Sequence, residues 1–141
     1  MVNDLLSMRG DVVIKLNDEV VLEKKNLIVT AGKAFLASAV LNSSTSPFTY
    51  MAIGTGTTAA AITDTALATE LTRSAFTTSS VASNVVTLTT TYAAGTGTGT
   101  LTEAGILNNS SGGTLLSRVV FSAINKGSAD SLTITWTITV G

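Results

Sequence analysis

The chain has 141 residues with no cysteine and no histidine, and its formal net charge is −1. Without cysteine, a disulfide framework and a thiolate metal site are excluded, and without histidine the commonest general base and metal ligand are missing. A net charge so close to zero provides no bulk attraction to nucleic acid or to an anionic membrane.

Charge is concentrated near the start of the chain. Residues 1–33 carry ten of the seventeen charged side chains, and the other 108 residues carry seven. A monomer normally relies on surface charge for solubility. Either serine and threonine hydrate the surface of the remaining part, or other subunits cover much of it.

The first thirty residues are expected to form an extended arm and a hairpin. Residues 1–9 show no periodicity and lack the basic and apolar regions of a signal peptide. Residues 11–16 and 20–23 alternate in polarity around Asn17 and Asp18, which predicts a β-hairpin with a polar turn. We therefore divide the chain into an N-terminal arm and hairpin, residues 1–30, and a body, residues 31–141.

One or two short helices are expected early in the body. Thr30 is a candidate N-cap for a helix over residues 34–41, and Asp64 is a candidate cap for a second helix that reaches Leu71. A short strand over residues 49–53 lies between them. It leads into Gly54-Thr-Gly56, which predicts a turn because it lacks the further residues of a phosphate-binding loop.

From Arg73 onward the pattern predicts strands, over residues 74–80, 84–94, 100–108, 114–123 and 131–140. The last of these alternates strictly, with Trp136 at the centre of its apolar face and threonine on the other face. Ala104-Gly105 indicates a bulge or a close backbone approach. The expected fold is mainly β: an antiparallel, jelly-roll-like β-sandwich with one or two short helices and the N-terminal hairpin.

No residue pattern predicts catalysis or a cofactor. Serine and threonine lack a histidine base, Asp64 and Glu70 do not form a glycosidase pair, and a calcium loop is absent from the sequence. Of the few charges in the body, Arg73, Glu103 and Arg118 have two interpretations, with Arg118 expected to face outward. They form scattered surface ion pairs, or they fix the register of a subunit contact through two-pronged arginine–carboxylate pairing.

Several phrases occur in a suggestive order: Asn26-Leu-Ile-Val-Thr-Ala-Gly-Lys33, Met51-Ala-Ile-Gly-Thr-Gly56, Asp64-Thr-Ala-Leu67 with Glu70, Leu101-Thr-Glu-Ala-Gly-Ile-Leu-Asn108, Arg118-Val-Val-Phe121, Ile124-Asn-Lys126 and Asp130-Ser-Leu-Thr-Ile-Thr-Trp136. Their succession, over residues 26–140, resembles small virion structural proteins of tailed bacteriophages, of the capsid-decoration (cement) and tail-associated kinds. The resemblance implies a non-enzymatic homo-oligomer, a dimer or trimer. It would assemble in the host cytoplasm onto the capsid surface, with the major capsid protein as partner and without nucleic acid or membrane.

Two placements in a virion remain open. A cement protein bridges and stabilises capsid subunits, whereas a tail or neck protein acts as a fibre adaptor or a receptor-binding module. Receptor-binding modules usually expose aromatic side chains, but Trp136, Phe121 and Tyr92 are expected to face the core. This favours the cement interpretation.

The arm also has two possible arrangements. It docks on a partner subunit by β-augmentation, with Lys15, Lys24 and Lys25 facing an acidic capsid surface, and residues 31–141 fold without it. Alternatively, its apolar residues complete the sheet of their own body: Val12, Ile14, Val20 and Leu22.

Overall fold

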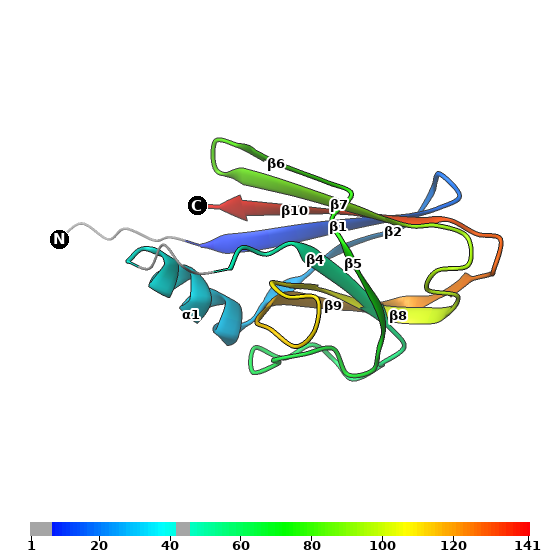
Figure 1. The fold of residues 1–141 in the computed structure, drawn as a ribbon, viewed down its shortest axis with the longest axis horizontal. Coiled ribbons are helices and arrows are strands. Elements are labelled where there is room, and N and C mark those ends of the chain that lie inside the picture. Colours follow the sequence, from blue (N-terminus) through cyan, green and yellow to red (C-terminus); the bar gives the residue numbers. More distant parts are fainter. Residues whose placement is uncertain (1–6, 42–45) are drawn as a thin grey trace.

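The computed structural model describes residues 7–41 and 46–141, which form ten strands and one helix. The strands make two five-stranded antiparallel sheets that pack face to face (Figure 1). We call them the Trp136 sheet and the Glu103 sheet. The expectation of a mainly β antiparallel sandwich is therefore confirmed, and its finer likeness to a jelly roll stays a prediction.

The Trp136 sheet has the strand order β2-β1-β10-β7-β6. Its strands are β1 (Met8–Leu16), β2 (Glu19–Lys25), β6 (Thr78–Ala82), β7 (Val85–Tyr92) and β10 (Leu132–Val140). The Glu103 sheet has the order β3-β9-β8-β4-β5. Its strands are β3 (Leu27–Ile28), β4 (Tyr50–Gly54), β5 (Glu70–Ala75), β8 (Gly99–Leu107) and β9 (Leu115–Lys126). The helix α1 (Thr30–Ala39) contacts β9.

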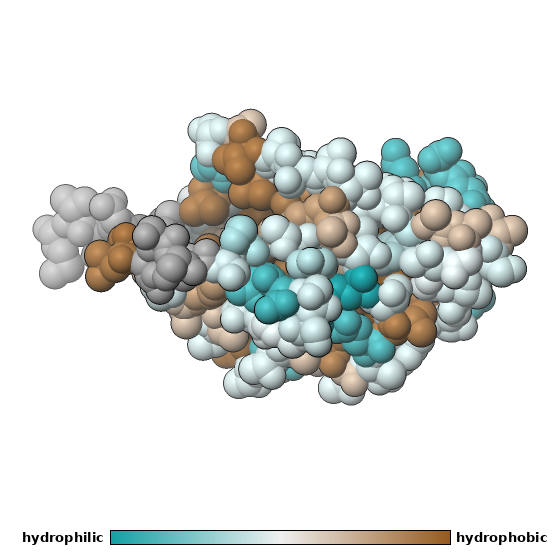
Figure 2. All heavy atoms as spheres, viewed as in Figure 1, coloured by the Kyte–Doolittle hydropathy of each residue, from teal (hydrophilic) through white to brown (hydrophobic). Residues whose placement is uncertain are grey.

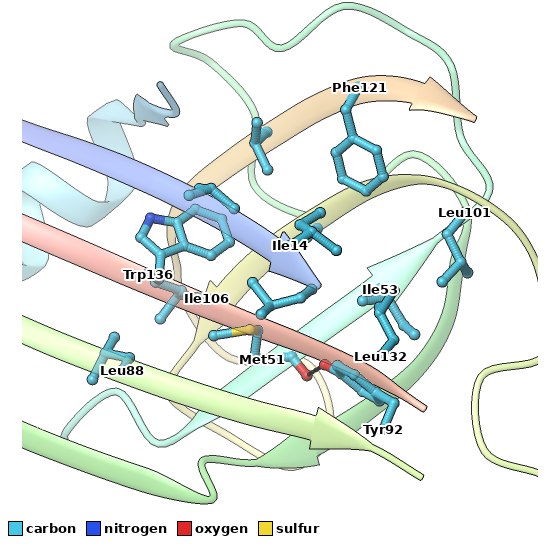
Figure 3. Close-up of a cluster of buried hydrophobic side chains, with 14 of the residues drawn as sticks. Ile14, Met51, Ile53, Leu88, Tyr92, Leu101, Ile106, Phe121, Leu132 and Trp136 are labelled. Carbon is cyan, nitrogen blue, oxygen red and sulfur yellow. Dashed lines mark hydrogen bonds between the residues drawn. The ribbon is translucent and has the colours of Figure 1, made fainter. Parts of the chain in front are cut away.

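The main core lies between the sheets, around β10. Trp136 is 0% exposed and lies opposite Val12 of β1 and Leu88 of β7 in the strand register. The close-up shows Trp136 among aliphatic side chains from both sheets, with the hydroxyl of Tyr92 donating a hydrogen bond to the carbonyl of Met51 (Figure 3). Trp136, Tyr92 and Phe121 are all buried, as the alternation predicts.

The predicted hairpin is the pair β1–β2. Its turn residues Asn17 and Asp18 have φ values of 50° and 67°, as in a type I′ turn, which matches the twist of a two-residue hairpin. β1 lies inside the sheet between β2 and β10, and Val12 and Ile14 enter the main core. The hairpin therefore completes the sheet of its own chain, the second of the two arrangements considered above, and no break in packing separates residues 7–30 from the rest.

The structure corrects three local predictions. Residues 74–80 are not one strand, because β5 ends at Ala75 and the chain crosses to the other sheet before β6 begins. Residues 64–71 do not form a helix, because their backbone groups bind elsewhere, as described below. Thr30 is the first helical residue rather than the cap; Val29 occupies the cap position without a side-chain hydrogen bond.

The outer face of the Glu103 sheet is also covered. Residues 55–69, which we call the covering loop, lie over it together with the start of α1. A second small core forms there from Val29, Ala52, Leu67, Leu107 and Leu115. β8 is therefore buried on both faces from Leu101 to Leu107, and a polar side chain on its outer face is enclosed by protein.

Candidate functional site

The most concentrated chemistry in the described part of the chain is a buried ion-pair cluster under the covering loop. Glu103 on β8 and Arg118 on β9 lie on adjacent strands, where Arg118 is opposite Gly105. Their exposed fractions are 0% and 1%. The prediction that Arg118 faces solvent is wrong, because the covering loop encloses the outer face of this sheet.

The Glu103 carboxylate accepts hydrogen bonds from three backbone groups of the covering loop. Oε1 accepts from the N–H of Gly56 at 2.9 Å and from the N–H of Thr69 at 2.7 Å. Oε2 accepts from the N–H of Ala68 at 2.9 Å and from Nε of Arg118 at 3.0 Å. One carboxylate thus holds both ends of the loop, since Gly56 is near its start and Thr69 is at its end.

The Arg118 guanidinium holds the middle of the same loop. Its Nε donates to Oε2 of Glu103 at 3.0 Å, and NH2 lies 2.9 Å from the same oxygen as an ion pair. NH1 donates to Oδ2 of Asp64 at 2.9 Å, and NH2 donates to the carbonyl of Thr58 at 2.8 Å. The two-pronged pairing expected at a subunit contact would use both oxygens of one carboxylate. Arg118 instead contacts one oxygen of Glu103 and one oxygen of Asp64, both within its own chain.

Two glycines allow the loop to approach this carboxylate. A Cβ atom at Gly54 would lie 2.6 Å from Oε1 of Glu103, and one at Gly56 would lie 2.5 Å from the same atom. Either distance is too short for a real contact, so both positions require glycine. Gly54-Thr-Gly56 therefore does bind an anion, namely a carboxylate of its own chain. Thr102 adds a bond from its hydroxyl to the carbonyl of Gly56 at 2.7 Å.

The electrostatics favour the charged form of both acids. Burial by itself raises the pKa of Glu103, but the donated hydrogen bonds and the Arg118 guanidinium outweigh burial and hold the pKa below its ordinary value. For Asp64, burial also raises the pKa, and the N–H of Ala61 together with Arg118 lowers it further than burial raises it. The cluster is therefore ionised at neutral pH and joined by charge-assisted hydrogen bonds.

This arrangement is suited to holding a loop rather than to reacting with a substrate. Each oxygen of Glu103 accepts two hydrogen bonds from fixed protein donors, so the carboxylate has no free position aimed at a cavity. Residues 7–41 and 46–141 contain no group of three or more acidic residues that could hold a metal ion.

The other predicted interface residues are Arg73 and the hairpin lysines, which do not take part in the ion-pair cluster. Arg73 pairs with Glu70 at 2.6 Å and donates from NH1 to the carbonyls of Asn109 and Gly112, which ties β5 to the hairpin loop between β8 and β9. The lysines Lys15, Lys24 and Lys25 are exposed on the β1–β2 hairpin.

Lys24 differs from its neighbours because its Nζ donates to the carbonyl of Val120 in the opposite sheet. Lys25 lies opposite Asp11 in the strand register, with Lys15 further along β1. Lys24 and Lys25 line an open cavity together with Arg118 and with Thr57, Ala59 and Ala60 of the covering loop. Lys15, Arg73 and Glu103 do not line this cavity. The role of the hairpin lysines at a partner surface stays a prediction.

Two participants in the cluster were not predicted as such. Asp64 was expected to cap a helix, and Gly56 was expected to form only a turn. The available signal was composition: Asp64, Glu103 and Arg118 are three of the seven charges in residues 34–141, and a Gly-x-Gly follows a buried strand. A charged side chain that is fully buried is almost always paired, so Glu103 and Arg118 on two apolar strands were candidates for a buried pair.

No protein-family model, curated protein or solved structure matches the chain. Within residues 7–41 and 46–141, no helix has the length and apolar character that a membrane span requires.

Proposed function

We propose that the chain is a non-enzymatic structural protein of a tailed-bacteriophage virion. Its proposed role is that of a capsid cement protein, which lies on the capsid surface and stabilises contacts between major capsid subunits. The proposal rests on the resemblance described above and on one surface of the sandwich.

That surface is the outer face of the Trp136 sheet over β7 and β10. Threonines occupy it in register, with Thr133 opposite Thr91, Thr135 opposite Thr89 and Thr137 opposite Thr87. The hydroxyls of Thr91 and Thr133 lie 3.1 Å apart. The side chains over these two strands are uncharged and β-branched, which suits contact with another protein. Charged residues flank them on β1, where Asp11 lies opposite Thr137 and Lys15 lies opposite Thr133.

The buried cluster supports the non-enzymatic part of the proposal. Backbone N–H groups of the covering loop and the Arg118 guanidinium bind the carboxylates of Glu103 and Asp64. These carboxylates therefore hold the loop in place. Such anchoring makes the body rigid, and rigidity suits a protein that must resist deformation of a shell.

Counting copies in purified virions tests the placement. Quantitative mass spectrometry should find the chain at hundreds of copies per particle, in a fixed ratio to the major capsid protein. A handful of copies would replace the cement role with the tail or neck role, and absence from the virion would reject both.

A binding assay tests the proposed surface. Particles that lack the protein should bind added wild-type protein, and Thr135→Lys should abolish binding because it places a charge at the centre of the threonine face. Ile62→Lys is the matched control, since Ile62 is exposed on the covering loop, away from that face. Equal binding of both variants would exclude the threonine face as the contact.

A further inference from the structure

The four sheet edges differ in how they are protected against pairing with another strand. β2 carries Glu19, Glu23, Lys24 and Lys25, and its register with β1 shifts at a bulge. β5 carries the Glu70–Arg73 pair, and β3 has only two residues. Charges, bulges and short length are the usual protections of an edge strand.

β6 has none of these protections. Its five residues are Thr-Ser-Ser-Val-Ala, all exposed, without charge or proline, and its register with β7 is regular. Figure 1 shows β6 at the outer edge of its sheet, beyond β7, with no strand of the other sheet against it. It is therefore an uncharged edge that presents unpaired backbone groups to solvent.

The hairpin geometry determines which backbone groups are free. The turn residues Ser83 and Asn84 separate the paired residues Ala82 and Val85, and residues that flank a two-residue turn form a hydrogen-bonded pair. By alternation, Thr78, Ser80 and Ala82 direct their backbone groups toward β7. The N–H and C=O groups of Ser79 and Val81 therefore point away from the sheet.

An exposed apolar side chain accompanies these free groups. Val81 is 72% exposed and lies opposite Val86, so both side chains are on the same face of the sheet. Val86 in turn lines an apolar cavity of about 300 Å³ between β7, β10 and α1. Figure 2 shows hydrophobic surface around this upper part of the molecule.

We propose that β6 pairs with β6 of a second copy of this chain, antiparallel about a two-fold axis at Ser80. In that register Ser79 of each copy lies opposite Val81 of the other, and these are the residues whose backbone groups are free. Two hydrogen-bonded residue pairs form, which joins the two Trp136 sheets into one continuous ten-stranded sheet.

A second copy fits this edge because the edge is complementary to itself. Two-fold pairing places Ser80 against Ser80, Ser79 against Val81 and Thr78 against Ala82, all small and uncharged. No charge is desolvated and no like charges meet, whereas a charged strand would lose water without gaining a partner. The proposal does not rest on the virion assignment, because it concerns the purified protein alone.

The contact is short, so the dimer is a weak one. A five-residue strand covers about 17 Å, and its interface falls below the roughly 1,000 Å² of a stable complex. Sedimentation velocity of the full chain between about 10 μM and about 1 mM should therefore show a reversible shift from monomer to dimer. A monomer throughout this range would overturn the proposal.

Two variants identify the edge. Val81→Lys adds a charge to each copy at the interface, and Ser79→Pro removes an N–H that points away from β7, so the hairpin keeps its own hydrogen bonds. Each should weaken dimerisation at least about tenfold. Val20→Lys is the matched control, because Val20 is an exposed valine on the protected edge β2.

Amide hydrogen exchange provides the second readout. In the wild type, exchange at Ser79 and Val81 should slow as concentration rises, while exchange at Val20 stays constant. Unchanged melting temperatures of the variants would show that their folds are intact. Dimerisation that survives both β6 variants, or that Val20→Lys abolishes, would assign the contact to another surface and overturn the proposal.

Discussion

Replacing Glu103 by glutamine keeps the size of the side chain and removes its charge. Arg118 would then lose its fully buried carboxylate partner and keep only Asp64, and the loop N–H groups would lose a charged acceptor. Breaking a buried pair from one side typically costs about 3–5 kcal/mol. We expect the free energy of unfolding, measured in urea, to fall by about that amount in Glu103→Gln.

The partly solvated pair Glu70–Arg73 supplies the control for this variant. Glu70→Gln removes a carboxylate from a partly solvated pair, which should cost no more than about 1 kcal/mol. Equal losses in the two variants would show that burial of Glu103 contributes nothing to the strength of its contacts.

Trp136 tests the main core in the same way. Trp136→Ala should lower the free energy of unfolding by about 3–5 kcal/mol, because it leaves a large cavity between Val12 and Leu88. Thr135→Ala on the outward face is the matched control and should change stability little. A melting temperature of Trp136→Ala near that of the wild type would contradict the central position of this residue.

The predicted and the observed burial agree best where the apolar and polar residues of a strand alternate strictly. The strict alternation around Trp136 predicted both its strand and its burial. Arg118 shows the limit, since alternation placed it correctly on the face opposite Val119 but could not show that the covering loop encloses that face. Periodicity reports which side of a strand a residue is on, whereas burial of that side depends on contacts distant in sequence.

At the scale of elements, the covering loop depends on ionised acids. The pKa of Glu103 and that of Asp64 are both held below their ordinary values in the folded protein. A lowered folded-state pKa adds stability at pH values above the unfolded pKa, near 4, and that stability is lost as the pH falls through the folded pKa. The loop should therefore loosen in acid.

Urea unfolding at a series of pH values between 7 and 3 measures this effect. The wild type should lose stability across the acidic part of the range, and Glu103→Gln should show a shallower dependence because it lacks the acid. Parallel curves for the two proteins would mean that other carboxylates determine acid stability. Asp130 is one such acid, since hydrogen bonds from Asn17 and Gly127 lower its pKa.

The position of the β1–β2 hairpin inside its own sheet determines the expected result of deleting residues 1–25. If the hairpin were a docking arm, the rest of the chain would fold without it. Removing residues 1–25 takes away Val12 and Ile14 from the core and exposes the long edge of β10. We expect an insoluble or molten product, judged by solubility and by the loss of a cooperative unfolding transition. A soluble, cooperatively folded fragment would instead support the docking arm.

Point variants test the packing of β1 against the core without removing the hairpin. Val12→Ala should destabilise the protein by more than Val13→Ala, because Val12 is buried in the core and Val13 is on the other face of β1. The sequence predicted this hairpin and its turn from residues 11–23 alone. It could not show which strand pairs with β1, because that strand is over a hundred residues away and is chosen by tertiary packing.

For the whole molecule, the pairing of β1 with β10 brings together residues that are far apart in the chain. Met8 lies opposite Val140, and the N–H of Gly141 donates to the carbonyl of Ser7. Forming the contact between Val12 and Trp136 therefore closes a loop that contains most of the chain. Bringing the two ends of so long a loop together costs conformational entropy.

This pairing has a kinetic consequence. Proteins dominated by such non-local contacts cross their folding barrier slowly. A circular permutant that joins the two ends through a short glycine-rich linker would turn β10 and β1 into a local hairpin. Opening the chain between Gly95 and Thr96 leaves the other hairpins intact, because β7 and β8 belong to different sheets. Stopped-flow refolding should be faster in the permutant than in the wild type at similar equilibrium stability. Equal rates would mean that the β1–β10 pair forms only after the barrier, so that early folding depends on the hairpins that both chains share.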